Sequence, residues 1–118
     1  MKKNKFVTVA AIQSVVSSDL KTNLEKTARL IERAAKKGAK IICLQELYRT
    51  IYFPQYKKAD KDSYMETVPG ESTCAFSILA KKYGVVIIVP IFEKRQNRYF
   101  NSVTVIDHTG KLMPTYDK

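Results

Sequence analysis

A glutamate that follows an apolar run is the carboxylate best placed to do chemistry. Residues 40–44 read Lys-Ile-Ile-Cys-Leu, which is typical of a buried strand, and Gln45 and Glu46 come directly after them. Ligand sites of α/β sheets lie at the carboxyl ends of strands. A carboxylate in an apolar cleft there has a raised pKa, which suits a general base. Glu46 is therefore a candidate general base, although an ordinary residue at a strand end fits the same pattern.

The cysteines and the histidine are weaker candidates for nucleophilic chemistry. Cys43 lies within the apolar run, where a cysteine usually acts as a small hydrophobic residue. Cys74 lies near the start of a predicted helix, whose dipole lowers the pKa of a thiol, but its neighbours supply no base. His108 falls in a predicted turn. Two distant cysteines predict neither a disulfide framework nor a metal site and indicate reduced thiols in a cytoplasmic protein.

Positive charge is the most unusual feature of the composition. The 118 residues include 21 Lys and Arg against 11 Asp and Glu, a net charge of +10. The basic residues are dispersed along the chain, and no zinc-finger or RNA-binding signature accompanies them. A solvated surface is therefore favoured over a nucleic-acid-binding face. The longest apolar run, Val85 to Phe92, is too short to span a bilayer, so no membrane partner is expected.

The N-terminus has some features of a signal peptide. Residues 1–5 are mostly basic and residues 6–12 mostly apolar. The apolar stretch is short, however, contains Thr8 and has no convincing cleavage site after it. We therefore predict that this segment is kept and forms the first strand.

Hydrophobic periodicity predicts strands that alternate with helices. The expected strands are 6–13, 40–44, 85–92, 100–106 and 111–117, and the expected helices are about 20–37 and 72–83. This βαβαβββ order predicts an α/β fold, with residues 1–118 forming one domain or part of one. The chain stops in a strand at Lys118, so we expect it to be part of a larger domain.

Local signals add detail to these elements. Asp19 is predicted to cap the first helix, and Gly38 and Gly84 to end the two helices. The strand at 40–44 is apolar on both faces and is expected to be covered on both. Pro90 suggests that strand pairing fails near the end of its strand.

Residues 47–70 show no periodicity and are expected to form an ordered surface loop.

A series of short motifs runs through the chain in order. They are Val-Thr-Val-Ala-Ala-Ile-Gln at 7–13, Asn23-Leu24, Ala-Ala-Lys-Lys-Gly-Ala-Lys-Ile-Ile at 34–42, Leu-Gln-Glu-Leu at 44–47, Tyr-Phe-Asn-Ser-Val at 99–103, Gly110-Lys111 and Tyr-Asp-Lys at 116–118. Each is weak alone, but the ordered set resembles the N-terminal part of the nitrilase superfamily of carbon–nitrogen hydrolases. The segment from Leu44 to Gln55 is most similar to N-carbamoylputrescine amidases and the related β-ureidopropionase-like enzymes.

The resemblance implies a partial four-layer α-β-β-α sandwich and a Glu-Lys-Cys catalytic set. By motif position, Glu46 corresponds to the family's general base and Lys118 to its catalytic lysine, with Asp117 where arginine is common. The family's nucleophilic cysteine lies further along the sequence than this chain extends. Neither Cys43 nor Cys74 is in a matching context, so the resemblance implies no nucleophile in this chain.

The expected function is therefore that of an amidase acting on a small amide or carbamoyl compound, such as N-carbamoylputrescine, in polyamine biosynthesis. No cofactor is expected, the full-length form is expected to be a homo-oligomer, and the isolated chain is expected to be inactive. A cationic substrate would need a carboxylate at its far end, for which Asp60, Asp62 and Glu66 are candidates. A catalytically dead binding or regulatory fragment and a basic nucleic-acid-binding domain are the alternatives.

Overall fold

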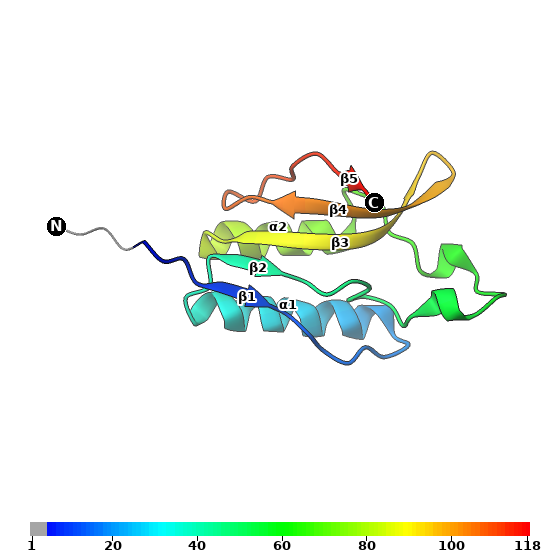
Figure 1. The fold of residues 1–118 in the computed structure, drawn as a ribbon, viewed down its shortest axis with the longest axis horizontal. Helices are drawn as coiled ribbons and strands as arrows, with labels where there is room; N and C mark the ends of the chain where they lie inside the picture. Colours follow the sequence, from blue (N-terminus) through cyan, green and yellow to red (C-terminus); the bar gives the residue numbers. More distant parts are fainter. Residues whose placement is uncertain (1–4) are drawn as a thin grey trace.

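A computed structural model describes residues 5–118 and contains one five-stranded sheet and two α-helices. The elements are β1 (Val9–Ala11), α1 (Leu20–Lys36), β2 (Ile41–Cys43), the 3-10 helices η1 (Phe53–Gln55) and η2 (Lys61–Ser63), α2 (Glu71–Tyr83), β3 (Val86–Arg95), β4 (Arg98–Ile106) and β5 (Tyr116–Asp117). Their sequence confirms the predicted βαβαβββ order (Figure 1). Residues 1–4, the basic start of the segment that was weighed against a signal peptide, lie outside the described part. Neither described α-helix is long and apolar enough to cross a bilayer.

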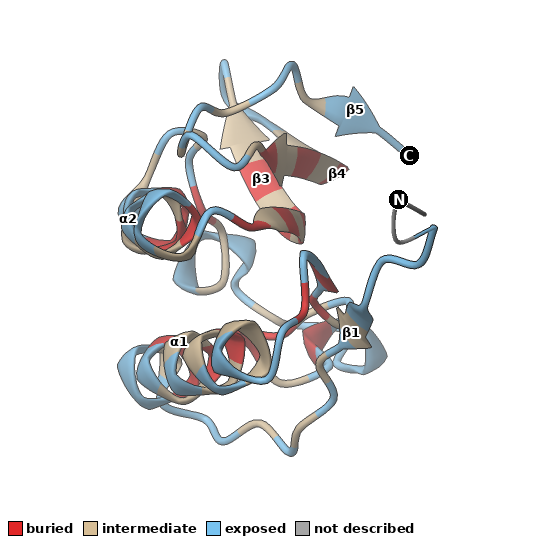
Figure 2. Ribbon diagram, turned by 90° about the vertical axis from the view of Figure 1, so that its left-hand side faces the viewer, coloured by how far each residue is buried: buried red, intermediate tan, exposed pale blue. Residues whose placement is uncertain are grey.

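The strands lie in the sheet in their sequence order. β1, β2 and β3 are parallel, whereas β4 and β5 join by antiparallel pairing. Because each parallel crossover is right-handed, two crossovers that advance in the same direction place both helices on the same face of the sheet. Figure 2 shows this arrangement, with the buried residues between the helices and the strands. The described residues thus form one helical layer and one sheet layer.

Local sequence explains where the helices begin and end. The Asp19 carboxylate caps α1 as predicted, because Oδ1 accepts hydrogen bonds from the backbone N–H groups of Lys21 and Thr22 at 3.0 and 3.2 Å. Leu24 and Ile31 lie on its buried stripe. The chain leaves α2 through Gly84, whose φ of 63° is the left-handed conformation that glycine adopts readily.

Among residues 5–118, the opposite face of the sheet is exposed along β1 and β2 and only partly buried along β3 and β4, which contradicts the expectation that residues 40–44 are buried on both sides. Ile42 is fully buried toward the helices, whereas its neighbours Ile41 and Cys43 are exposed. The predicted buried strand at 6–13 is also shorter, and its Val9 is 65% exposed.

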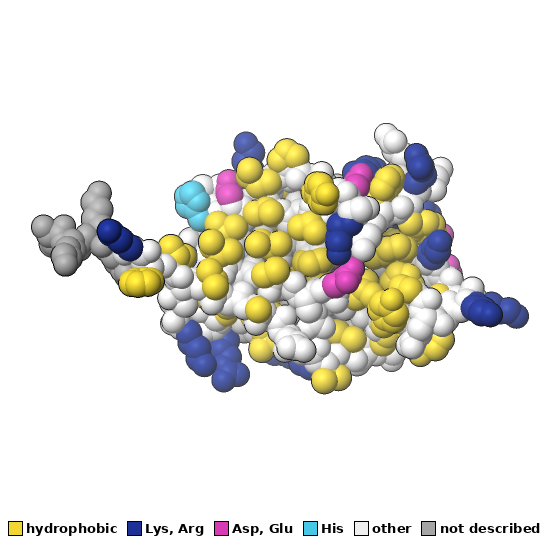
Figure 3. Space-filling view, viewed as in Figure 1, with side chains coloured by type: hydrophobic (Ala, Val, Ile, Leu, Met, Phe, Trp, Pro, Cys, Tyr) yellow, Lys and Arg dark blue, Asp and Glu magenta, His cyan; other side chains and the backbone are white. Residues whose placement is uncertain are grey.

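We call this uncovered surface the open face. Alternation and register place Val9, Ala11, Ile41, Cys43, Val86, Ile88, Val103 and Val105 on it. Figure 3 shows hydrophobic side chains gathered there, interrupted right of the centre by a basic side chain beside an acidic one, with further Lys and Arg at the rim of the molecule.

The β3–β4 hairpin is longer than the sequence suggested. Pairing with β4 continues past Pro90 to Arg95, contrary to the prediction, whereas pairing with β2 ends at Ile88. The Leu44 N–H donates to the Ile88 carbonyl, which shows that even-numbered β3 residues direct their backbone groups toward β2. Pro90 falls where β2 has already ended, so no β2 partner requires its missing N–H. Gln96 and Asn97, with φ of 52° and 60°, form a two-residue turn, and β4 starts at Arg98 instead of residue 100.

Two further segments differ from expectation. The predicted surface loop at 47–70 contributes five buried residues: Tyr48, Arg49, Thr50, Phe53 and Glu66. The last strand was expected over 111–117 but comprises only Tyr116–Asp117, with one isolated bridge at Leu112. In both segments, side chains form part of the hydrogen bonds that the backbone N–H and C=O groups require. Such contacts leave no periodic signal in the sequence.

Candidate active site

Glu46 and Lys118 meet although 72 residues separate them in the sequence. Glu46 follows β2 by three residues, and Lys118 follows β5 directly. The Lys118 Nζ donates to the Glu46 Oε1 at 3.3 Å. Both side chains are about half exposed, at 46% for Lys118 and 56% for Glu46. The fold therefore brings together the two residues that the motif resemblance singled out.

Asn101 on β4 binds both residues, and sequence reasoning gave it no role. Its side-chain Nδ2 donates to the Glu46 Oε1 at 3.0 Å, while its backbone carbonyl accepts from the Lys118 N–H at 2.7 Å. One residue thus fixes the carboxylate and the backbone that carries the lysine. One sequence feature could have identified it: Asn101, in the Tyr-Phe-Asn-Ser-Val motif, is a polar residue on the same face of its strand as the apolar Val103 and Val105.

Electrostatics at Glu46 are opposite to the sequence-based expectation of a raised pKa. Hydrogen bonds from Asn101 and Lys118, together with the lysine charge, hold the pKa of Glu46 below its ordinary value of 4.5. Burial acts in the other direction but is the weakest of these influences, because the side chain is more than half exposed. In the described residues, Glu46 is thus ionised at neutral pH, and these two donors make it a weaker base than a free carboxylate.

We expect Asn101→Ala to raise the pKa of Glu46 toward 4.5, since Asn101 is the largest single cause of the lowering. A lowered pKa in the folded state means that ionised Glu46 stabilises the fold above pH 4.5, and that this contribution disappears as the pH falls through the lowered pKa. Carboxyl-carbon NMR titration measures the shift. Val103→Ala, next along the same face, is the control, and an equal shift in that variant would contradict the role of Asn101.

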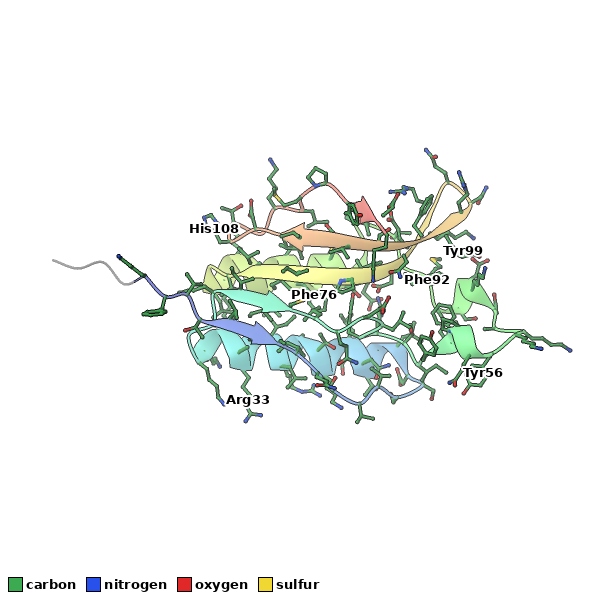
Figure 4. All side chains as sticks on the ribbon, in the orientation of Figure 1. Arg33, Tyr56, Phe76, Phe92, Tyr99 and His108 are labelled. Carbon is green, nitrogen blue, oxygen red and sulfur yellow. The ribbon has the colours of Figure 1, made fainter. Side chains whose placement is uncertain are left out.

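A cavity of about 590 Å³ opens beside Glu46 and can hold a small molecule. Its walls come from the segment after β2 and from the β3–β4 hairpin, and they are largely aromatic. The rings of Phe92 and Tyr99 stack at 5.4 Å, and Phe53 packs on Phe92 at 4.7 Å. Figure 4 shows Phe92 and Tyr99 at the end of the molecule that also carries Tyr56, another residue of the cavity wall.

None of the three acidic residues considered for a cationic substrate lines this cavity; among the described lining residues, Glu46 is the only acid. Glu66 is buried and paired with Arg49 at 2.9 Å. Asp62 binds Lys94 at 2.7 Å and also accepts from the Tyr99 hydroxyl. Asp60 caps η2 through the Asp62 N–H at 3.1 Å. All three carboxylates are already engaged in holding the fold.

The thiols and the histidine remain apart from this site. Cys43 is exposed on the open face, Cys74 is exposed on α2, and His108 lies in an exposed turn. Over residues 5–118, no hydrogen bond joins either thiol to Glu46, Lys118 or His108. The same part of the chain contains no group of three or more His, Cys, Asp and Glu residues that could hold a metal ion.

Comparison with known proteins identifies the family to which this chain is similar. The profile of the carbon–nitrogen hydrolase family matches residues 7–118. N-carbamoylputrescine amidase from Solanum lycopersicum is 41% identical over 117 residues, covering 98% of this chain and 39% of the relative. The enzyme of the same name from Solanum tuberosum is 40% identical with the same coverage.

A solved structure gives the same result. The carbon–nitrogen hydrolase from Helicobacter pylori G27 superposes with a TM-score of 0.84 at 33% identity, covering 95% of this chain and 39% of the other. The chain therefore spans about two fifths of the length of these relatives. The match confirms the nitrilase-superfamily resemblance and the mixed α/β fold. Because the family profile covers nearly all of the sequence, the chain belongs to the carbon–nitrogen hydrolase family.

Proposed function

We propose that this chain supplies the general base and the oxyanion-stabilising lysine of an enzyme that hydrolyses N-carbamoylputrescine. The observation that carries the proposal is the contact of the Glu46 Oε1 with the Lys118 Nζ at 3.3 Å, beside a cavity of small-molecule size. The similarity to N-carbamoylputrescine amidases supports the choice of substrate. The reaction would release putrescine in the cytoplasm, as a step of polyamine biosynthesis.

The proposed chemistry needs a thiol from a segment that this chain does not include. Glu46 takes the proton of that thiol, and the thiolate attacks the carbamoyl carbon. The Lys118 ammonium stabilises the negative charge that develops on the carbonyl oxygen. Glu46 then gives the proton to the leaving amine, and the carbamoyl group stays on the thiol as a thioester. Glu46 next activates a water molecule, which breaks the C–S bond and gives carbamic acid and the free thiol. The carbamic acid decomposes to carbon dioxide and ammonia.

The cavity suits the aliphatic part of such a substrate. Rings of Phe53, Phe92 and Tyr99 offer an apolar wall against which methylene groups can pack. Because Asp60, Asp62 and Glu66 are all engaged elsewhere, we expect the carboxylate that pairs with the substrate ammonium to come from another part of the enzyme.

Complementation tests the proposal. This chain is mixed with the segment of the tomato enzyme that follows the matched region, and putrescine release is followed by chromatography. We expect release from the mixture and none from either part alone. Hydrolysis by the chain alone, or a stable but inactive complex of the two parts, would contradict the proposal.

A further inference from the structure

The backbone conformation next to Glu46 must be held by its surroundings. Leu47 has a φ of 56°, a left-handed conformation that is unfavourable for a leucine. Such a conformation persists where the chain is fixed on both sides. On the N-terminal side, the Leu44 N–H donates to the Ile88 carbonyl at 3.0 Å and fixes the chain to β3. The C-terminal side is fixed by side chains.

Tyr48 and Arg49 provide this second anchor, and both bind the carboxylate of Glu66. The Tyr48 ring is buried against Phe76 at a centroid distance of 5.5 Å, and its hydroxyl donates to the Glu66 Oε2 at 3.2 Å. The Arg49 Nη1 donates to the Glu66 Oε1 and to the Ser72 Oγ, both at 2.9 Å. The segment after Glu46 is therefore tied to one buried carboxylate, whose side chain is 7% exposed.

Glu66 in turn is part of the sheet edge beyond the end of β2. Its backbone N–H donates to the Phe92 carbonyl, and its carbonyl accepts from the Lys94 N–H, both at 2.9 Å. Phe92 is the register partner of Asn101, which holds Glu46. Glu66 thus connects the segment that carries Glu46 to the β3–β4 pair, which carries Asn101, the hydrogen-bond donor to Glu46.

We propose that Glu66 is a positioning residue: by holding Tyr48 and Arg49 to β3, its carboxylate keeps Glu46 in contact with Asn101 and Lys118. The inference rests on the proposed function only in treating Glu46 as the general base. A purely structural ion pair would stabilise the fold and leave the surroundings of Glu46 unchanged. The two roles can therefore be separated by measuring the titration of Glu46 itself.

The test is Glu66→Gln in the full 118-residue chain, labelled with carbon-13 at the glutamate carboxyl groups. Glu46→Gln identifies the resonance of Glu46. We expect Glu66→Gln to raise the pKa of Glu46 to its ordinary value of 4.5, because Asn101 and Lys118 no longer meet it.

Charge alone predicts the opposite sign. Removing the negative charge of Glu66 leaves Arg49 with Glu71 as its carboxylate partner and can only lower the pKa of Glu46. The other charges nearby, on Lys118 beside Glu46 and on Glu93 and Arg95 of β3, are unchanged by the substitution. The direction of the shift therefore distinguishes lost positioning from altered charge.

Glu71→Gln is the matched control, because Glu71 binds the same Arg49 at 2.7 Å through a carboxylate that is 65% exposed. It should leave the titration of Glu46 unchanged. A folded Glu66→Gln chain, judged by circular dichroism, in which the pKa of Glu46 stays low or falls would overturn the proposal.

If Glu66→Gln does not fold, Tyr48→Phe is the second test, because it removes one hydrogen bond to Glu66 and keeps the ring. We expect it to raise the pKa of Glu46 by a smaller amount. An unchanged pKa of Glu46 in this variant would overturn the proposal. Absence of hydrolysis in the complementation assay would affect only the proposed function.

Discussion

Glu46→Gln is expected to abolish putrescine release in the complemented enzyme while leaving its fold intact. The amide is nearly isosteric with the carboxylate and can still accept hydrogen bonds from Asn101 and Lys118 through its oxygen. It cannot accept the thiol proton. Loss of general-base catalysis costs about 10²–10⁴-fold in rate, and more here because the same group acts in both acylation and thioester hydrolysis. Steady-state rates of the mixture measure the effect.

Cys74→Ala is the control for this experiment. The Cys74 thiol is exposed on α2, and the described structure joins it to neither Glu46 nor Lys118. We expect the variant to retain full activity. Loss of activity in Cys74→Ala, with activity kept in Glu46→Gln, would reverse the assignment of roles and make the helix-terminal thiol the nucleophile.

Much of the fold could be predicted because its signals are local. Asp19, Gly38 and Gly84 mark helix boundaries through backbone chemistry that involves only neighbouring residues. The apolar runs around Ile42 and Ile87 mark strands in the same way. The order of these elements then restricts the topology, since right-handed crossovers leave few ways to arrange βαβαβ.

The errors arose where long-range contacts decide the outcome. A run that is apolar on both faces indicates that neither face favours water, but it does not show which segment covers each face. The sequence therefore predicted that Ile41 is buried, whereas it is exposed. The burial of Arg49 in the 47–70 segment depends on Glu66 and Glu71, which no periodicity connects to it.

The candidate site also contains one residue that a local pattern identifies and others that it does not. Glu46 was visible from its position after a strand, whereas Lys118 was recognisable only by resemblance to a family. Asn101 escaped notice because its role depends on the register of β4 against β5, which sets its backbone beside Lys118. The expectation of a raised pKa for Glu46 failed because it counted burial and omitted these two donors.

The open face predicts a second large effect, which concerns association. Monomeric proteins seldom expose a continuous apolar surface larger than a few hundred Å². Here Val9 and Ile41 are exposed side by side on paired strands, and the apolar surface extends across β3 and β4 (Figure 3). We therefore expect the isolated chain to self-associate through this face, with a sedimentation coefficient that rises with concentration.

Ile41→Lys should weaken this association, because pairing two copies through the face would then bury an ammonium group without a partner. Ile78→Lys is the matched control: it makes the same substitution on α2, on the other side of the sheet, at a residue that is 68% exposed against 37% for Ile41. If exposure alone drove association, the Ile78 variant would show the larger effect. Sedimentation velocity of both variants distinguishes the two cases, and a wild-type chain that remains monomeric at all concentrations would show that the open face is not an association surface.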